Sequence, residues 1–362
     1  MDEEIAARVE LACLPGLRRA HAQRLIERFG SARAVLGARA QTLAAWLPRA
    51  LAEAVARAGG SRSAHRLVAD AAARGIRALA PGSAGFPCAL ASIPDPPLVV
   101  WLRGALPENA ALAIVGARRA SARGLATARS FASEIARARI AVVSGLAYGI
   151  DAAAHEGALA GEGPTVAVLA SGLDRVTPTG QTRLAERILT AGGAWLSEHA
   201  PGGGGRPYHF PERNRLISGL ASATLVVEAR EKSGSLWTAR HALEQGRDVL
   251  VVPGPIDSEL CRGTNRLLRE GATPILEPAD AIEAVLGPLS RRTHSGEPDA
   301  MAGAGGLGSA ILARLADGPR DADEIARELG RGPAELAASL LELELAGLLR
   351  RDGTRLARTR PG

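Results

Sequence analysis

The order of apolar and polar residues divides the chain into a helical start, an alternating middle and a helical end. Within the first 78 residues, apolar side chains recur at helical spacing over 8–29 and again over 42–58. From about residue 79, short and almost continuously apolar runs alternate with helical stretches, of which 124–137 and 236–245 are the clearest. The runs that predict strands cover residues 112–115, 140–143, 165–169, 223–227 and 248–252.

Strands that are apolar along their whole length are buried on both faces, so helices must cover both sides of the sheet. We therefore predict an α/β fold for residues 79–287, with an extended, Rossmann-like, doubly wound parallel sheet. A helical domain over residues 1–78 precedes it. Ligands of such sheets bind beyond the carboxyl ends of the strands, and glycines follow four of the predicted strands here.

The end of the chain predicts a small separate domain. Residues 288–307 are rich in small residues and predict a linker. Within 308–362, helical segments near 310–315, from Asp321 and over 333–349 precede a turn at 351–354, the order of a winged helix. The third helix contains three glutamates and no basic residue. Because that charge opposes phosphate, we predict a protein-contact module rather than a DNA reader.

The helical start contains a candidate DNA-binding turn. Residues 14–17 resemble a helix-hairpin-helix, which presents helix N-termini to phosphates. Arg18 stands where that motif usually has its second glycine, and a plain turn between helices is the alternative. Residues 1–78 carry 13 basic and 7 acidic side chains, which accounts for the net charge of +6 of the whole chain. A polyanion bound elsewhere would therefore need a local cluster of cations.

Composition indicates the compartment of the protein and whether it binds a metal. The chain has 362 residues, 46% of them hydrophobic, and no apolar run reaches the roughly 20 residues that span a bilayer. Its three cysteines are far apart and lack metal-ligand spacing, so we expect a cytoplasmic protein without a metal or another cofactor. Lys232 is the single lysine among 44 basic residues, which indicates a need for its compact ammonium, with chance as the alternative.

Four loops at strand ends, residues 115–124, 143–151, 208–215 and 228–238, carry the candidate chemistry. Each combines small residues that let a ligand approach with arginine or lysine, and the helix N-termini that follow strands attract anions. In the third loop, aromatic side chains alternate with arginines, as in a groove that binds single-stranded nucleic acid. The alternatives are core packing for Phe210 and salt bridges to carboxylates for Arg213 and Arg215. The candidate residues are Arg118 and Arg119, then Ser144, Gly145 and Gly149, then Tyr208, Phe210, Arg213, Asn214 and Arg215, and finally Lys232, Ser233, Gly234 and Ser235.

These four loops, together with Phe86-Pro87 and Asn265-Arg266-Leu267 at the two ends of the match, closely resemble the DprA family (DNA-processing protein A, also called Smf). The resemblance covers roughly residues 85–280. It implies a dimer that binds single-stranded DNA cooperatively and loads the recombinase RecA onto it, in natural transformation and recombination. It also implies flanking helical and winged-helix domains.

The resemblance assigns roles to individual residues. The family's pocket arginine falls on Arg118, its Phe-Pro and Arg-Asn-Arg residues on Phe210 and 213–215, and its lysine before Ser-Gly-Ser on Lys232. We expect Arg118, Arg213 and Lys232 to contact phosphates and Phe210 to stack on a base. The backbones at 144–145 and 233–235 are expected to cradle phosphates, whereas Asp151 and Asn214 hold loops.

Enzymatic interpretations fit less well. Around Lys232 the glycines of a P-loop are absent, and Ser144 is not in a nucleophile elbow. Asp151 and His155 lie one helical turn apart and could form an acid–base pair, with a helix cap and a hydrogen-bonded core histidine as the alternative. Residues 201–205 match the glycine loop of Rossmann phosphoribohydrolases only in part, since its threonine and glutamate are missing. We therefore expect no enzyme; a protein that coats single strands without loading a recombinase is a further alternative.

Overall fold

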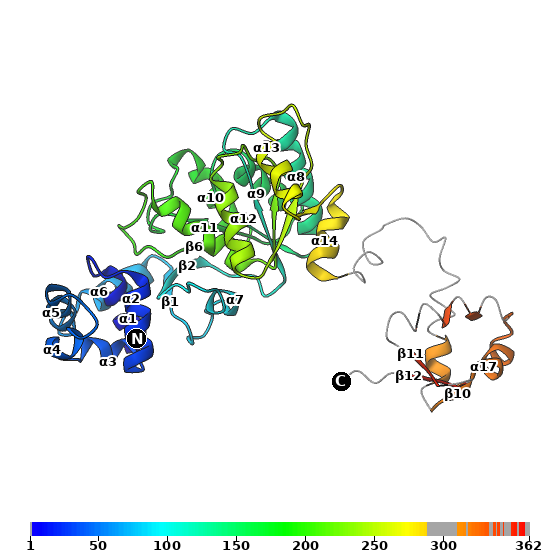
Figure 1. Ribbon diagram of the computed structural model, residues 1–362, viewed down its shortest axis with the longest axis horizontal. Helices are drawn as coiled ribbons and strands as arrows, with labels where there is room; N and C mark the ends of the chain where they lie inside the picture. Colours follow the sequence, from blue (N-terminus) through cyan, green and yellow to red (C-terminus); the bar gives the residue numbers. More distant parts are fainter. Residues whose placement is uncertain are drawn as a thin grey trace. The chain divides into compact units, whose positions relative to one another are not determined.

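The chain folds into two compact units, residues 1–294 and 295–362 (Figure 1). The computed structural model describes residues 2–287, 310–315, 318–332, 336–337, 339–340, 343, 349–352 and 355–358. The linker predicted at 288–307 lies outside these residues. No helix within the described ranges is long and apolar enough to cross a membrane.

The first unit begins with a helical domain whose helices are shorter than the periodicity suggests. Asp2 caps the first helix by accepting a hydrogen bond from the Glu4 amide. Gly16, with φ at 84°, makes the turn to the second helix, and Gly30, with φ at 85°, ends that helix. The helices are α1 (Glu3–Cys13), α2 (Arg19–Phe29), α3 (Ala32–Leu36), α4 (Ala40–Leu43), α5 (Arg49–Ala58) and α6 (Ser63–Ala73).

A nine-stranded sheet forms the centre of this unit, in the order β1-β2-β6-β5-β4-β3-β7-β8-β9. Strands β3 to β9 are parallel, whereas β1 and β2 add an antiparallel edge. This confirms the doubly wound sheet, with β1, β2, β6 and β9 as strands that the periodicity did not predict. The strands are β1 (Ile76–Leu79), β2 (Val100–Gly104), β3 (Ala111–Val115), β4 (Ala141–Ser144), β5 (Thr165–Leu169), β6 (Ala194–Ser197), β7 (Ala223–Val226), β8 (Asp248–Val251) and β9 (Thr273–Pro274).

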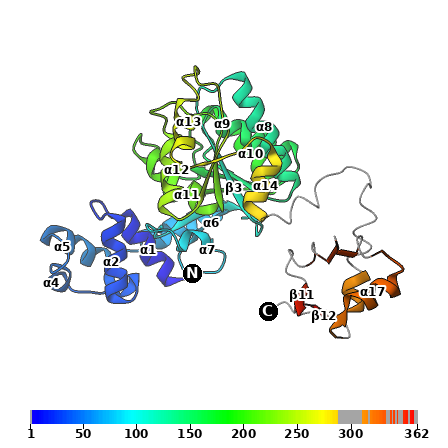
Figure 2. The same cartoon turned by 45° about the vertical axis from the view of Figure 1, so that its right-hand side comes forward.

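Helices cover both faces of the sheet, as the uniformly apolar strands require. Figure 2 shows α11 (His209–Leu220), α12 (Ser235–Glu244) and α13 (Arg262–Arg269) on one side, where α7 (Cys88–Ala91) also packs. The opposite side carries α8 (Ala122–Arg137), α9 (Ile150–Ala160), α10 (Thr182–Thr190) and α14 (Pro278–Leu286), and a short 3₁₀ turn, Thr179–Gln181, precedes α10.

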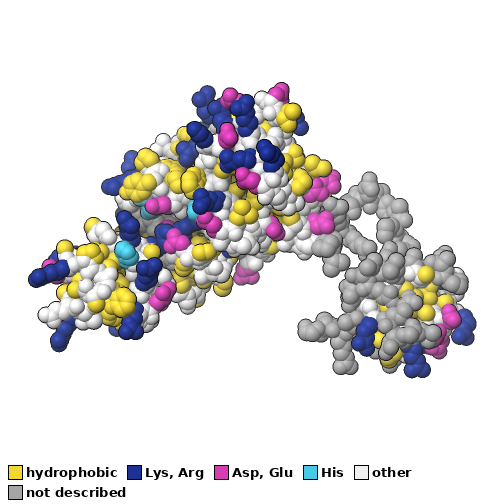
Figure 3. Space-filling view, in the orientation of Figure 1, with side chains coloured by type: hydrophobic (Ala, Val, Ile, Leu, Met, Phe, Trp, Pro, Cys, Tyr) yellow, Lys and Arg dark blue, Asp and Glu magenta, His cyan; other side chains and the backbone are white. Residues whose placement is uncertain are grey.

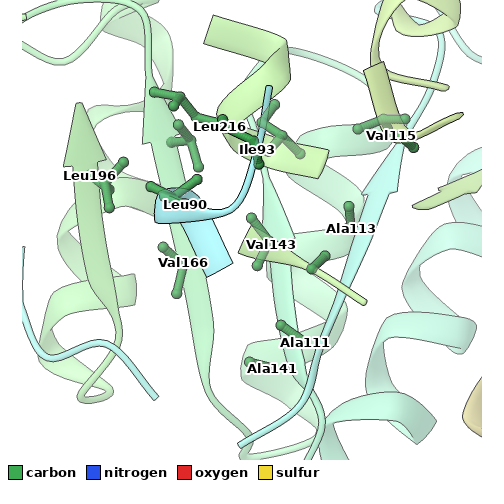
Figure 4. Packing of buried hydrophobic residues seen from close by; sticks show 14 of the residues in the cluster. Leu90, Ile93, Ala111, Ala113, Val115, Ala141, Val143, Val166, Leu196 and Leu216 are labelled. Atoms are coloured by element: carbon green, nitrogen blue, oxygen red, sulfur yellow. The ribbon is translucent and has the colours of Figure 1, made fainter. Parts of the chain in front are cut away.

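The larger core joins the sheet to α11 and to the segment that carries α7. Leu90 and Ile93 pack over Val143 and Val166, and Leu216 of α11 completes the cluster (Figure 4). All five side chains are buried. Because α11 is fixed to the sheet by this contact, the residues at its first turn have a defined position at the sheet edge.

The second unit is a winged helix, as predicted. Strands β11 (Leu349–Asp352) and β12 (Arg355–Arg358) form the hairpin, and β10 (Arg320–Asp321) pairs with β12. Helix α17 (Ala322–Leu329) starts at Asp321, whose carboxylate accepts from the Asp323 amide. The predicted third helix does not reach residue 349, because Leu349 already belongs to β11. Described residues Ile311, Ile325, Leu340 and Leu356 form its core.

Candidate nucleic-acid interface

A cavity of about 530 Å³ opens at the carboxyl ends of β3, β4 and β7. Strand β3 lies between β4 and β7, so the cavity is at the point where the strand order reverses and where doubly wound sheets bind ligands. Figure 3 shows Lys and Arg side chains gathered at the end of the sheet domain that carries α13 in Figure 1. Among the residues that line the cavity are Arg118, Arg119, Asp151, Pro207, Phe210, Arg213, Asn214, Lys232, Ser233, Gly234 and Ser235.

The loop after β3 is fixed by Glu228, which follows β7. The Glu228 carboxylate accepts from the Ser121 amide at 2.9 Å and from the Ser121 hydroxyl at 2.5 Å. The Ala117 amide donates to the Glu228 carbonyl at 2.7 Å. These bonds hold the loop on both sides of Arg118 and Arg119, whose side chains are exposed. The motifs assigned Glu228 no role, although it stands at the start of the fourth one.

Arg118 and Phe210 meet across the cavity. The guanidinium carbon lies 5.2 Å from the centroid of the Phe210 ring, within the range of a cation–π contact. Phe210 belongs to the first turn of α11 and is only partly buried, and it is part of none of the buried core clusters of the described residues. The aromatic ring therefore lines a ligand site rather than the core.

Lys232 and the Ser-Gly-Ser segment also line the cavity, at the start of α12. Lys232 is exposed. The Ser233 and Ser235 hydroxyls are 2.8 Å apart, and the Asn214 side-chain amide donates to the Gly234 carbonyl at 3.2 Å. Asn214 thus holds a loop, as expected. In the described part of the chain, no ion pair joins Arg118, Arg119 or Lys232 to a carboxylate.

Arg213 has a different setting from the one that the sequence predicts. It is only 5% exposed, and its Nη1 donates to the Gly145 carbonyl at 2.7 Å and to the Val168 carbonyl. Burial lowers its pKa to about 10, an effect that the nearby Asp151 carboxylate opposes. Although Arg213 borders the cavity, its geometry is that of a clamp between β4 and β5 rather than of a free phosphate ligand.

Ser144, Gly145 and Gly149 do not take the phosphate-binding positions that the sequence predicts. The Ser144 hydroxyl is fully buried and donates to the Ile114 carbonyl at 2.6 Å. A Cβ at Gly145 would lie 2.7 Å from the Arg213 guanidinium carbon, and one at Gly149 would lie 2.2 Å from the Ala117 carbonyl. Both glycines allow close packing within the protein, and none of the three residues lines the cavity.

Arg215 also lies outside the cavity, so its assignment to nucleic acid does not hold. It is 4% exposed and forms ion pairs with Glu198, which follows β6, and with Asp95 at 3.5 Å. Arg19 of α2 bonds to the same two carboxylates, to Asp95 Oδ1 at 2.7 Å and to Glu198 at 3.2 Å. These ion pairs match the salt-bridge alternative for Arg215, and they connect the helical domain to α11. Because Arg19 stands in its first turn, α2 contacts the sheet domain at the end that a helix-hairpin-helix presents to DNA.

Tyr208 lies beside the cavity but does not line it. Its ring meets that of His209 edge-on, with 4.3 Å between centroids, and His209 lies 4.1 Å from His199. Burial lowers the pKa of His199 to about 4, with the neighbouring His209 as a smaller cause, and burial also lowers the pKa of His209. Both shifts favour the neutral form of the rings.

Asp151 and His155 do not form an acid–base pair. The Asp151 carboxylate accepts from the Ala147 amide at 3.3 Å; burial raises its pKa, while the charge of Arg213 acts in the opposite direction. His155 is fully buried, its Nδ1 is 2.7 Å from the Thr165 hydroxyl, and burial lowers its pKa to about 3. Asp151 holds the loop after β4 and is not the cap of α9, whereas His155 is a hydrogen-bonded core histidine, as the alternative stated.

Comparison with known proteins agrees with this geometry. Residues 77–286 match the family model of the DNA recombination-mediator protein A, and residues 296–353 match the DprA winged helix domain. Protein Smf of Escherichia coli is 38% identical over 269 residues, which cover 72% of each chain. DNA processing protein DprA of Bacillus subtilis is 38% identical over 221 residues, 60% of this chain and 74% of that one.

Two solved structures share the fold. DNA processing protein A of Streptococcus pneumoniae superposes with a TM-score of 0.61 at 28% identity, over 78% of this chain and 97% of that one. DNA processing protein A of Helicobacter pylori, a structure described for its single-stranded DNA binding mode, gives a TM-score of 0.52 at 28% identity, over 58% and 95%. The motifs, the sheet order and the two matching family models together show that the chain belongs to the DNA recombination-mediator protein A family, also called DprA or Smf.

Proposed function

We propose that this protein binds single-stranded DNA in the cavity at the ends of β3, β4 and β7. The observation that carries the proposal is the set of exposed cations without a described ion pair, Arg118, Arg119 and Lys232, around a cavity that also contains the ring of Phe210. Cations for phosphates and an aromatic ring for bases are the two parts of a single-strand site. The single-stranded DNA binding of the Helicobacter pylori relative supports the proposal.

The geometry distinguishes two groups of residues. Arg118 and Lys232 face the cavity from different loops and take consecutive phosphates, while a base stacks on Phe210. The amides at the start of α12 add favourable partial positive charge. Arg213 and Asp151 keep the loops in place instead of touching DNA. A duplex is disfavoured because its bases are already stacked and paired, so none can lie on Phe210 without unstacking.

Delivery of the bound strand to a RecA recombinase is the second part of the proposal. It is supported by membership in a family described as recombination mediators. RecA filament assembly on strands that a single-strand coating protein already covers would measure it. Faster assembly with this protein supports delivery, and unchanged assembly with normal binding would indicate a protein that only coats DNA.

We also propose a homodimer. Trp237 and Leu243 are 50% and 61% exposed and border a second cavity of about 450 Å³, whose lining also contains charged side chains and shares Lys232 and Ser233 with the first cavity. Large apolar side chains at the surface favour a protein contact, and the family resemblance names a second copy as the partner. Replacing Leu243 by glutamate should convert the dimer to a monomer in light scattering; an unchanged mass would exclude this surface.

A titration by fluorescence anisotropy tests DNA binding. Labelled single-stranded and duplex DNA of one length are compared for the wild type and for Arg118→Ala, Lys232→Ala and the double variant. Arg187→Ala, an exposed arginine on α10, is the matched control. We expect preference for the single strand, lost in the double variant and retained in the control. Equal binding of both DNA forms, or normal binding by the double variant, would contradict the proposal.

We propose that the site binds without catalysing a reaction. Its one buried carboxylate, Asp151, is engaged by backbone amides, and His155 lies within the core. The phosphoribohydrolase alternative is tested by ribose release from nucleoside monophosphates. Release above the rate of the Arg118→Ala/Lys232→Ala variant would make the protein an enzyme.

A further inference from the structure

Beside the cavity, Tyr208 and His209 at the start of α11 form a row of rings with His199, which follows β6, and none of the three lines the cavity. Tyr208 is 52% exposed, its edge-on contact with His209 is backed by His199, and Arg206 Nη1 donates to the Tyr208 hydroxyl at 3.1 Å. One ring contact, with His209, and one hydrogen bond, from Arg206, thus restrain the Tyr208 ring while half of its surface remains exposed.

The position of Tyr208 follows from its neighbours in the chain. Pro207 and Phe210 both line the cavity. Consecutive Cα atoms are about 3.8 Å apart, so the Tyr208 backbone is within one residue of the cavity rim. A nucleotide next to the one in the cavity would therefore lie close to the Tyr208 backbone, where the side chain is exposed.

The fold itself makes little use of this side chain. Tyr208 occupies the cap position of α11 but makes no side-chain capping bond, and it belongs to no buried cluster of the described residues. A large apolar ring that is exposed yet restrained in orientation loses little entropy when a ligand stacks on it. Bases stack on aromatic rings without sequence preference, which suits a protein that binds single strands in general.

We propose that Tyr208 is a stacking platform for a second base of the single strand, next to the base held at Phe210. His209 and His199 support the platform, and Arg206 lies beside it for the phosphate between the two nucleotides. This inference rests on the proposed function, because it extends the cavity into a site for at least two consecutive bases.

The test combines protein variants with DNA that lacks single bases. Oligodeoxythymidines of increasing length, and one length with an abasic position moved along the strand, are titrated against the wild type, Tyr208→Ala and Tyr208→Phe. Trp46→Ala is the matched control, since Trp46 is a ring 56% exposed on the helical domain. Stacking of one base corresponds to a change in affinity of about 5-fold to 150-fold.

We expect Tyr208→Ala to lose affinity within that range, and Tyr208→Phe and Trp46→Ala to bind as the wild type does. One abasic position should weaken the wild type by the same factor and have no further effect on Tyr208→Ala. Normal binding by Tyr208→Ala, or a full additional abasic penalty at every position in that variant, would overturn the platform. If the platform alone is wrong, the Arg118→Ala/Lys232→Ala variant still loses binding; if the proposed function is wrong, the wild type shows no single-strand preference.

Discussion

Replacing Arg213 by methionine distinguishes a structural clamp from a phosphate ligand. The change removes the guanidinium but keeps an unbranched side chain. In the structure, Nη1 donates to the carbonyls of Gly145 and Val168, and the positive charge opposes the rise that burial causes in the pKa of Asp151. Without the guanidinium, the two carbonyls lose a donor and the buried carboxyl group loses a nearby positive charge.

The size of the effect follows from these contacts. Each of the two buried carbonyls left without a donor costs about 1–3 kcal/mol, and Asp151 also loses the nearby positive charge that favours its ionised form. These contributions overlap, so we expect the free energy of unfolding to fall by about 4 kcal/mol. For a unit of this size, that corresponds to a melting temperature lower by roughly 10 °C.

Two measurements check this prediction. Thermal and urea unfolding of Arg213→Met are compared with those of Arg118→Met, whose exposed arginine should change stability by no more than about 1 kcal/mol. The salt dependence of single-strand binding is measured for both. Arg118→Met should reduce the log–log slope by about 0.7, the value for one phosphate contact on a single strand. If Arg213→Met is as stable as the wild type and instead shows that reduced slope, Arg213 is a phosphate ligand and the clamp is wrong.

Further predictions concern other parts of the chain. Folding lowers the pKa of His155, so the contribution of this residue to the free energy of unfolding is fully present above pH 6.5 and is lost progressively as pH falls toward 3. At pH 5, about 2 kcal/mol of that free energy should be lost. His155→Gln should therefore flatten the acid side of a curve of stability against pH. Gly124→Ala would place a Cβ 2.3 Å from the Glu228 carboxyl carbon, so we expect a melting temperature several degrees lower. In the control Gly246→Ala, the new Cβ has no neighbour within 4 Å, and only the smaller cost of backbone strain at a φ of 67° should appear. Deleting residues 308–362 should leave single-strand affinity within about 2-fold, since their third helix is acidic; a large loss in a gel-shift titration would refute the protein-contact assignment. Lys232→Arg should weaken binding if the compact ammonium is required, and wild-type affinity would contradict that requirement.

Periodicity predicted the centre of the sheet but not its edges. The strands β3, β5 and β7 are buried along their whole length and are apolar apart from one threonine each in β5 and β7, and that pattern is visible in the sequence. Strand β6 was not predicted although β4, of the same length, was, and β1 pairs antiparallel with β2 across the boundary placed at residue 78. Pairing with distant residues determines these edge strands, and a local pattern does not contain it.

In the candidate site, too, a local sequence pattern does not show which distant residues come into contact. Motifs identified Arg118, Phe210 and Lys232, which the structure brings to one cavity. They could not separate Arg213 from Arg215 or say what either contacts. Two residues apart on α11, one lies under the loop after β4 and the other faces the carboxylates of Asp95 and Glu198. Only the packing of α11 against the sheet decides which carbonyls and carboxylates each guanidinium meets.

The ion pairs around Glu198 have a consequence for how this chain can be divided. Two arginines and two carboxylates balance there, and one arginine, Arg19, comes from the helical domain. A fragment that starts after residue 75 would keep Asp95, Glu198 and Arg215 and so carry one uncompensated negative charge at the base of α11. The helical domain is therefore not a detachable module, and a sheet domain expressed without it would differ from the intact protein at the helix that presents Phe210 and Tyr208.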